Sequence, residues 1–127
     1  MEYLFWYTSM DRNTTTLKAR FFRSETGSEP VREWLNSLSR TDKHLIGTEI
    51  RTIQIAWPLG MPIVRKLEKG LWEARIRLAN QIARVLFTTD EDTMILLHGF
   101  IKKSQKTPAP DLATARQRKA ATERHKQ

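Results

Sequence analysis

The stretch LWEARIRLANQIARVLF, residues 71–87, decides the fold of this chain. Apolar and polar side chains alternate along it, and Ala79 and Asn80 stand at its centre, so the pattern predicts a β-hairpin with a two-residue loop. One face of such a hairpin is apolar and packs on a core. The cross-strand pairs expected on that face are Trp72 with Phe87, Ala74 with Val85, and Ile76 with Ala83.

The other face of this hairpin is charged, and the same register places Arg75 directly across from Arg84. Like charges that face each other across a strand pair are destabilising, so one interpretation is that the two arginines hold an anion between them. Phosphate is the obvious candidate. The alternative is an ordinary solvated face, on which both arginines point into water beside Glu73 and Arg77.

The flanking segments extend the hairpin into a larger sheet. Alternation and turn residues predict further strands at 17–23, 63–68 and 93–100. Lys69-Gly70 and the acidic run Asp90-Glu91-Asp92 are expected to form the turns between neighbouring strands.

Two amphipathic helices are expected between the first strand and the rest. Ser28 is the predicted cap of a helix with Pro30 in its first turn, and a second helix runs from about Thr41 to Trp57. A basic helix follows from Asp111. The fold class is therefore α+β: a mostly antiparallel twisted sheet of four to five strands, with an α-hairpin packed on one face and a basic C-terminal helix.

Composition narrows the class of protein. We interpret residues 1–16 as an N-terminal extension and residues 17–127 as a single domain. The opening MEYLFWY is too short for a membrane span, and it lacks the preceding basic segment of a signal peptide. The chain has no cysteine, which excludes disulfides and thiolate metal sites, and its histidines lack metal-ligand spacing. We therefore expect no metal and no cofactor, and a cytoplasmic protein.

The net charge of +8 is concentrated near the C-terminus. Residues 102–127 hold eight basic side chains against two acidic ones, which indicates a polyanionic partner. Nucleic acid fits better than a membrane, because the basic segments lack a strongly apolar opposing face.

The segment LHGFIKKSQKTP, residues 97–108, leaves the last strand beside the arginine hairpin. Lys102, Lys103 and Lys106 are thus expected to join Arg75 and Arg84 round one concavity. Crowding by other cations lets a lysine give up its proton and act as a base, while arginines match the oxygens of a phosphate in its transition state.

Such a set of residues suits RNA cleavage without a metal. A base takes the proton of a ribose 2′-hydroxyl, that oxygen attacks the adjacent phosphorus, and the products are a 2′,3′-cyclic phosphate and a 5′-hydroxyl. A lysine-rich loop that only contacts the phosphate backbone explains the same spacing. His98 is expected to be a hydrogen-bonded structural residue, with a general acid as the second interpretation.

The chain resembles the RelE/ParE toxin superfamily, and more closely its HigB-like branch of phage-derived proteins. The resemblance covers roughly Leu17 to Arg124 and rests on FFRSETGSEPVREWLNSL, LWEARIRL, IARVLF and above all LLHGFIKKSQKTP. It implies a toxin that enters the ribosomal A site and cleaves mRNA. It also implies a cognate antitoxin, commonly of the helix-turn-helix type, and a toxin–antitoxin heterotetramer is one assembly to expect.

The catalytic residues carry over from this resemblance by position. The expected catalytic residues are Arg75, Arg84, Lys102 and Lys103, and the expected RNA-contacting residues are Arg65, Lys66, Arg77, His98, Lys106 and Arg116. Several relatives place a tyrosine near the C-terminus, whereas both tyrosines here, Tyr3 and Tyr7, lie in the extension. Stacking on the substrate then falls to His125, Phe100 or Trp72, or is absent.

Two other functions stay open at this point. One is an inhibitor in the manner of the ParE branch, which binds a topoisomerase and leaves mRNA whole. The other is a non-catalytic nucleic-acid-binding module with strongly salt-dependent affinity. For a toxin, we expect the antitoxin to cover the arginine face or to displace the C-terminal helix.

Overall fold

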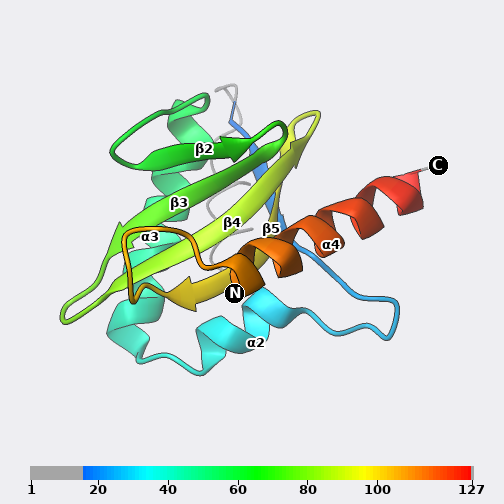
Figure 1. Cartoon of the computed structure of the whole chain (residues 1–127). Helices are drawn as coiled ribbons and strands as arrows, with labels where there is room; N and C mark the ends of the chain where they lie inside the picture. The colour runs from blue at the N-terminus through cyan, green and yellow to red at the C-terminus, as the bar shows by residue number, and fades with distance from the viewer. Residues whose placement is uncertain (1–15, 127) are drawn as a thin grey trace.

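A computed structural model describes residues 16–126, so the extension expected at 1–16 lies outside the described residues except for Thr16. The described chain forms a five-stranded sheet in the order β1-β5-β4-β3-β2 (Figure 1). The strands are β1 (Lys18–Phe21), β2 (Val64–Glu68), β3 (Leu71–Arg77), β4 (Ile82–Asp90) and β5 (Thr93–Ile101), and the helices are α2 (Pro30–Asn36), α3 (Arg40–Ala56) and α4 (Ala109–Lys126).

This arrangement confirms the predicted α+β class and the mostly antiparallel sheet. β1 is the exception, because it lies parallel to β5, while the other neighbouring strands run antiparallel. Parallel neighbours need a long connection, and here the two helices α2 and α3 lie within it.

The central hairpin forms in the predicted register. Trp72 pairs with Phe87 and Arg75 with Arg84, and the Leu78 N–H donates to the Gln81 carbonyl at 2.8 Å, which closes the loop at the expected place. On the apolar face, the side chains of residues 74, 76, 83, 85 and 87 are buried.

Helices α2 and α3 cover that apolar face as an α-hairpin, and Val31, Leu35 and Ile50 pack in the same core as the strands. α3 begins where Ser39 accepts a hydrogen bond from the Asp42 N–H at 3.1 Å. The predicted cap of α2 was wrong. Glu29 occupies that position, and its side chain makes no capping hydrogen bond; the Ser28 hydroxyl donates to the Glu33 carboxylate at 3.0 Å.

Helix α4 lies across the opposite face of the sheet, in front of the strands in the view of Figure 1. Its Ala115 is fully buried in a second core with Leu71, Leu86 and Leu97. Small side chains let the helix approach closely, and polar contacts add to that packing. A bidentate pair joins Arg116 to Glu68 of β2, at 2.7 Å and 3.0 Å to the same oxygen.

The described residues, 16–126, contain no helix with the length and apolar character that crossing a bilayer requires.

Candidate nucleic-acid interface

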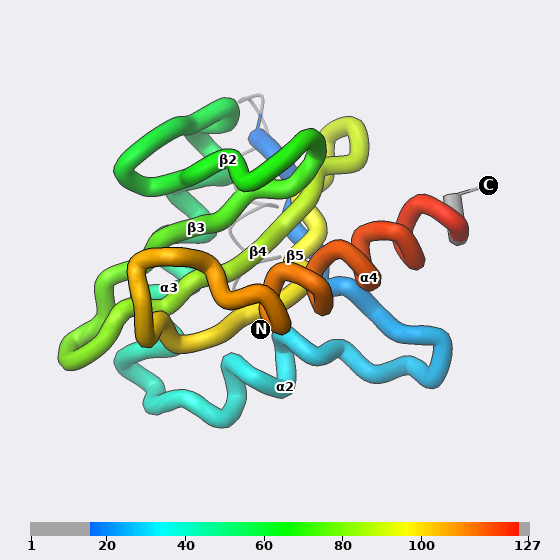
Figure 2. The backbone as a smooth tube through the Cα atoms, in the orientation of Figure 1, coloured from blue at the N-terminus to red at the C-terminus, as the bar shows by residue number. Residues whose placement is uncertain are grey.

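Residues 102–108, here called the strap, connect the end of β5 to the start of α4. Figure 2 shows this orange segment passing over the sheet on the side that α4 covers. Three contacts join the strap to the sheet. The Lys102 N–H donates to the Ile82 carbonyl at 2.7 Å, Arg84 Nη1 donates to the Gln105 carbonyl at 3.2 Å, and the Thr107 hydroxyl donates to a Glu73 oxygen at 2.7 Å.

A concavity of about 660 Å³ lies between the strap and the loop of the central hairpin. Its cationic lining residues are Arg77, Lys102 and Lys103. A second hollow of about 320 Å³ is lined by Arg75, Arg77 and Lys102. Because Arg77 and Lys102 line both, four of the predicted site cations gather round two adjoining hollows.

The second hollow also has one acidic lining residue, Glu49 of α3. β2 begins only at Val64, which pairs with Ala74, so the last residues of β3 have no strand beyond them. α3 therefore reaches the rim of this hollow at the edge of the sheet. Burial raises the pKa of the Glu49 carboxyl above its ordinary value.

Arg84 lines neither hollow, and the interpretation of a solvated face was wrong for this residue. Its side chain is 0% exposed, and so is that of Glu73. Nη1 of Arg84 lies 3.2 Å from one Glu73 oxygen and 3.4 Å from the other. The anion that offsets the facing arginines is therefore a carboxylate of the protein itself, placed diagonally across the hairpin.

The buried guanidinium of Arg84 is only partly used. Its Nη1 donates to Glu73 and to the Gln105 carbonyl, but Nε and Nη2 find no hydrogen-bond partner within the described residues. Buried polar atoms are normally satisfied, so two unused donors on one charged group are unusual. Arg84 lines neither hollow, because the strap covers it.

His98 has the hydrogen-bonded structural position that its sequence context predicts. Its Nε2 lies 2.6 Å from an Asp111 carboxylate oxygen, and Nδ1 lies 3.4 Å from Nη1 of Arg118. The same Arg118 nitrogen donates to the Leu97 carbonyl at 2.8 Å, and burial lowers the pKa of this arginine. These contacts hold the first half of α4 against β5.

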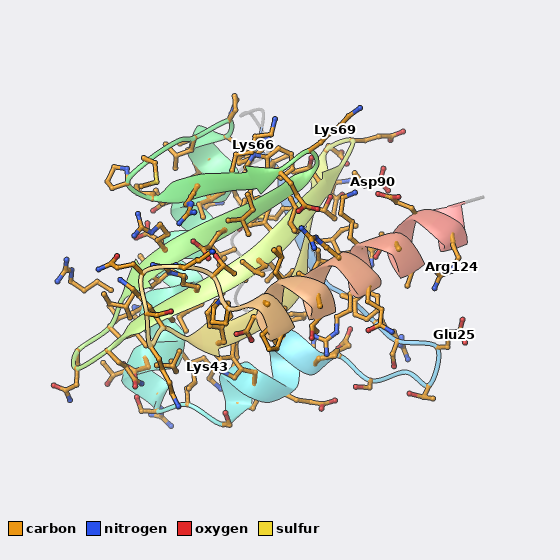
Figure 3. The ribbon with its side chains drawn as sticks, viewed as in Figure 1. Glu25, Lys43, Lys66, Lys69, Asp90 and Arg124 are labelled. Atoms are coloured by element: carbon orange, nitrogen blue, oxygen red, sulfur yellow. The ribbon has the colours of Figure 1, made fainter. Side chains whose placement is uncertain are left out.

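The other residues that were predicted to contact RNA do not line the two hollows. Arg116 is paired with Glu68, which lowers the pKa of that carboxyl, and Lys106 is exposed on the strap without lining either hollow. Arg65 lies opposite Glu73 on the strap side of β2. Lys66 pairs with Trp72 on the other side, and Figure 3 shows it at the outer edge of the sheet, away from the strap.

The proposed stacking residues also have structural partners. Trp72 packs among Trp57 and Phe87 on the helix-covered face, with ring centroids 5.1 Å and 5.9 Å away. Phe100 stacks on the ring of His98 at 5.7 Å. The side chain of His125 lies outside the described part of the chain.

Sequence reasoning missed the contributions of Glu73, Thr107 and Glu49. Glu73 could have been found, because the predicted hairpin already places it on the same face as Arg84. Thr107 carries no local signal, since its contact with Glu73 spans 34 residues. Among the residues that the structure describes, no group of three His, Cys, Asp or Glu side chains is placed to hold a metal ion.

Comparison with known protein families gives a match over most of the chain. Residues 33–120 match the profile of a family described as "Phage derived protein Gp49-like (DUF891)". The matched region runs from α2 to α4 and includes the central hairpin and the whole strap. A search of curated proteins finds no significant match.

Proposed function

This chain belongs to the Gp49-like family of phage-derived proteins, a toxin family of toxin–antitoxin systems within the RelE/HigB-type group, and on that premise we propose that it is a ribosome-dependent mRNA endoribonuclease. The observation that carries this proposal is the gathering of Arg75, Arg77, Lys102 and Lys103 round two adjoining hollows. A concentration of cations in a concave surface attracts and orients a phosphodiester backbone.

In the proposed reaction, each side chain that lines the hollows has its own role. Lys102 or Lys103 accepts the proton of the ribose 2′-hydroxyl, and the 2′-oxygen attacks phosphorus. Arg75 and Arg77 donate hydrogen bonds to the non-bridging oxygens as negative charge develops on them. The other of these two lysines, in its ammonium form, gives a proton to the 5′-oxygen as the P–O5′ bond breaks, which yields a 2′,3′-cyclic phosphate and a 5′-hydroxyl. Each step uses only side chains of this protein and needs no metal.

The proposal extends to partners and place of action. The toxin acts in the cytoplasm on mRNA in the ribosomal A site, and a cognate antitoxin, of helix-turn-helix type in our proposal, neutralises it. The antitoxin either covers the two cationic hollows or displaces α4 from the sheet. A complex that is inactive while both surfaces remain open would contradict this.

Translating ribosomes with a defined message provide the test. We expect the purified protein to cut the message within codons, and the new ends should carry a 2′,3′-cyclic phosphate and a 5′-hydroxyl. The double substitution Lys102→Ala/Lys103→Ala should abolish cutting. Lys69→Ala is the matched control, because Lys69 is an exposed lysine in the β2–β3 turn, far from the strap in Figure 3.

Two results would reject the nuclease. Intact mRNA together with DNA damage in cells would indicate a topoisomerase inhibitor of the ParE type. Salt-dependent RNA binding without any strand breakage would indicate a non-catalytic binding module.

A further inference from the structure

The strap and the residue beneath it carry an inference that rests on the proposed function and deepens it. Arg84 has a side chain suited to binding phosphate, yet it is completely buried, and among residues 16–126 two of its donor nitrogens have no hydrogen-bond partner. We propose that the strap is a gate, which must lift before Arg84 can bind the phosphodiester of an RNA, and that Glu73 holds Arg84 in place until then.

The contacts across the strap suit a reversible closure. Residues 103–106 are exposed, so the middle of the strap buries no apolar surface that would lock it down. It is held there by the bond from Arg84 to the Gln105 carbonyl and, next to it, by the Thr107 hydroxyl bond to Glu73. Breaking two hydrogen bonds is a small free-energy change compared with unfolding a core element.

Other bonds lie within the strap itself. Lys102 Nζ donates to the Gln105 side-chain oxygen at 3.3 Å, and the Ser104 hydroxyl donates to the Lys106 carbonyl at 2.9 Å. These bonds do not cross to the sheet, so the segment can keep its own shape as it moves.

The charges explain why RNA would open the gate. The strap carries Lys102, Lys103 and Lys106, and it closes over Arg84 beside Arg75, so closure crowds these cations, and Glu73 offsets the charge of Arg84. A phosphodiester that enters the adjoining hollow attracts the strap lysines and so draws the strap away from Arg84. Once the Gln105 carbonyl withdraws, the unused Nε and Nη2 of Arg84 offer the paired donors that match two phosphate oxygens.

Thr107 provides a sharp test, because two near-isosteric substitutions separate its hydroxyl from its shape. Thr107→Val removes the bond to Glu73, and Thr107→Ser keeps it. The probe is a short single-stranded RNA that is 2′-O-methylated throughout, so it lacks the attacking hydroxyl and cannot be cleaved. We expect Thr107→Val to bind this RNA about tenfold more tightly than the unaltered protein, because the open state becomes more populated, and Thr107→Ser to bind as the unaltered protein does.

Hydrogen exchange on the unaltered protein is the second measurement, and it does not depend on any variant folding. The amides of residues 103–107 should exchange faster when the RNA is bound. A strap with a purely structural role predicts slower or unchanged exchange there, and either result overturns the proposal. Equal or weaker RNA binding by Thr107→Val also overturns it, as does the absence of RNA binding by both proteins.

These results separate the gate from the nuclease. If the protein fails to cut mRNA on ribosomes while the strap responds to RNA as described, the nuclease is rejected and the gate stands. If the protein cuts mRNA but neither the Thr107→Val affinity nor the exchange changes as expected, only the gate is rejected.

Discussion

Removing the Arg84 guanidinium should destabilise the whole domain, because the substitution Arg84→Ala leaves the Glu73 carboxylate buried without its cation. Both side chains are 0% exposed, and their closest atoms are 3.2 Å apart. Breaking a buried ion pair by deleting one partner costs about 3–5 kcal/mol. Small domains have a free energy of unfolding of about 5–15 kcal/mol, so this loss is a large fraction of the total.

Urea unfolding followed by tryptophan fluorescence measures this loss, and the melting temperature should fall by about 10–20 °C. The double substitution Glu73→Leu/Arg84→Met is the control, because it removes both charges and keeps most of the volume. Replacing a buried pair by apolar residues is often neutral or stabilising, so the double variant should be more stable than Arg84→Ala by about 3 kcal/mol or more.

An Arg84→Ala protein with the stability of the parent would refute this reasoning, because it would mean that water or a rearranged strap already compensates Glu73. The same measurement bears on activity. A loss of mRNA cleavage in Arg84→Ala cannot be assigned to the chemical step until the folded fraction of the variant is known.

Three further substitutions test other parts of the structure. Gly99→Ala should lower the free energy of unfolding by about 1–3 kcal/mol, since an added Cβ would overlap the Trp34 ring on the helix-covered face; thermal melting checks this. Arg77→Ala should reduce mRNA cleavage about 10²-fold or more with little change in melting temperature, because the side chain is exposed and lines both hollows. Arg116→Ala should make the stability of the fold less dependent on pH. Because Arg116 lowers the pKa of Glu68, the pair stabilises the fold above the ordinary glutamate pKa, and this stabilisation is lost on acidification. The melting temperature should therefore vary less between about pH 3 and 6 in the variant.

The fold could be predicted from the sequence to the level of strand register. Residues 71–87 alternate cleanly and carry a central turn, so the pairing of Trp72 with Phe87 follows from the order of the residues alone. The second helix was equally clear, because Ile46, Ile50 and Ile53 recur on one stripe. These features are local, and local periodicity reports them well.

The site was harder to predict, because its decisive contacts are not local. The sequence places Arg84 on the charged face of the hairpin and predicts that residues 97–108 leave the last strand beside it, but it does not show that this segment crosses over Arg84. The strap crosses over Arg84, whose side chain is fully buried. The error about its exposure came from assuming that a charged strand face is a solvated face, which fails when α2 and α3 cover one side of the sheet and α4 with the strap covers the other.

The buried pair also explains why a cation suited to phosphate can be kept inside a stable domain. The buried guanidinium is repelled by the arginine that lies opposite it across the strand pair, and its burial adds a desolvation cost. Glu73 offsets both effects, and the Thr107 hydroxyl satisfies one of its oxygens at 2.7 Å. The same contacts hold the strap closed, so any change that loosens the strap acts on Arg84 at the same time. On the gate proposed above, stability of the closed protein and access to Arg84 are coupled through Glu73, and we expect a partner that stabilises the closed strap to inhibit the protein without contacting Arg84.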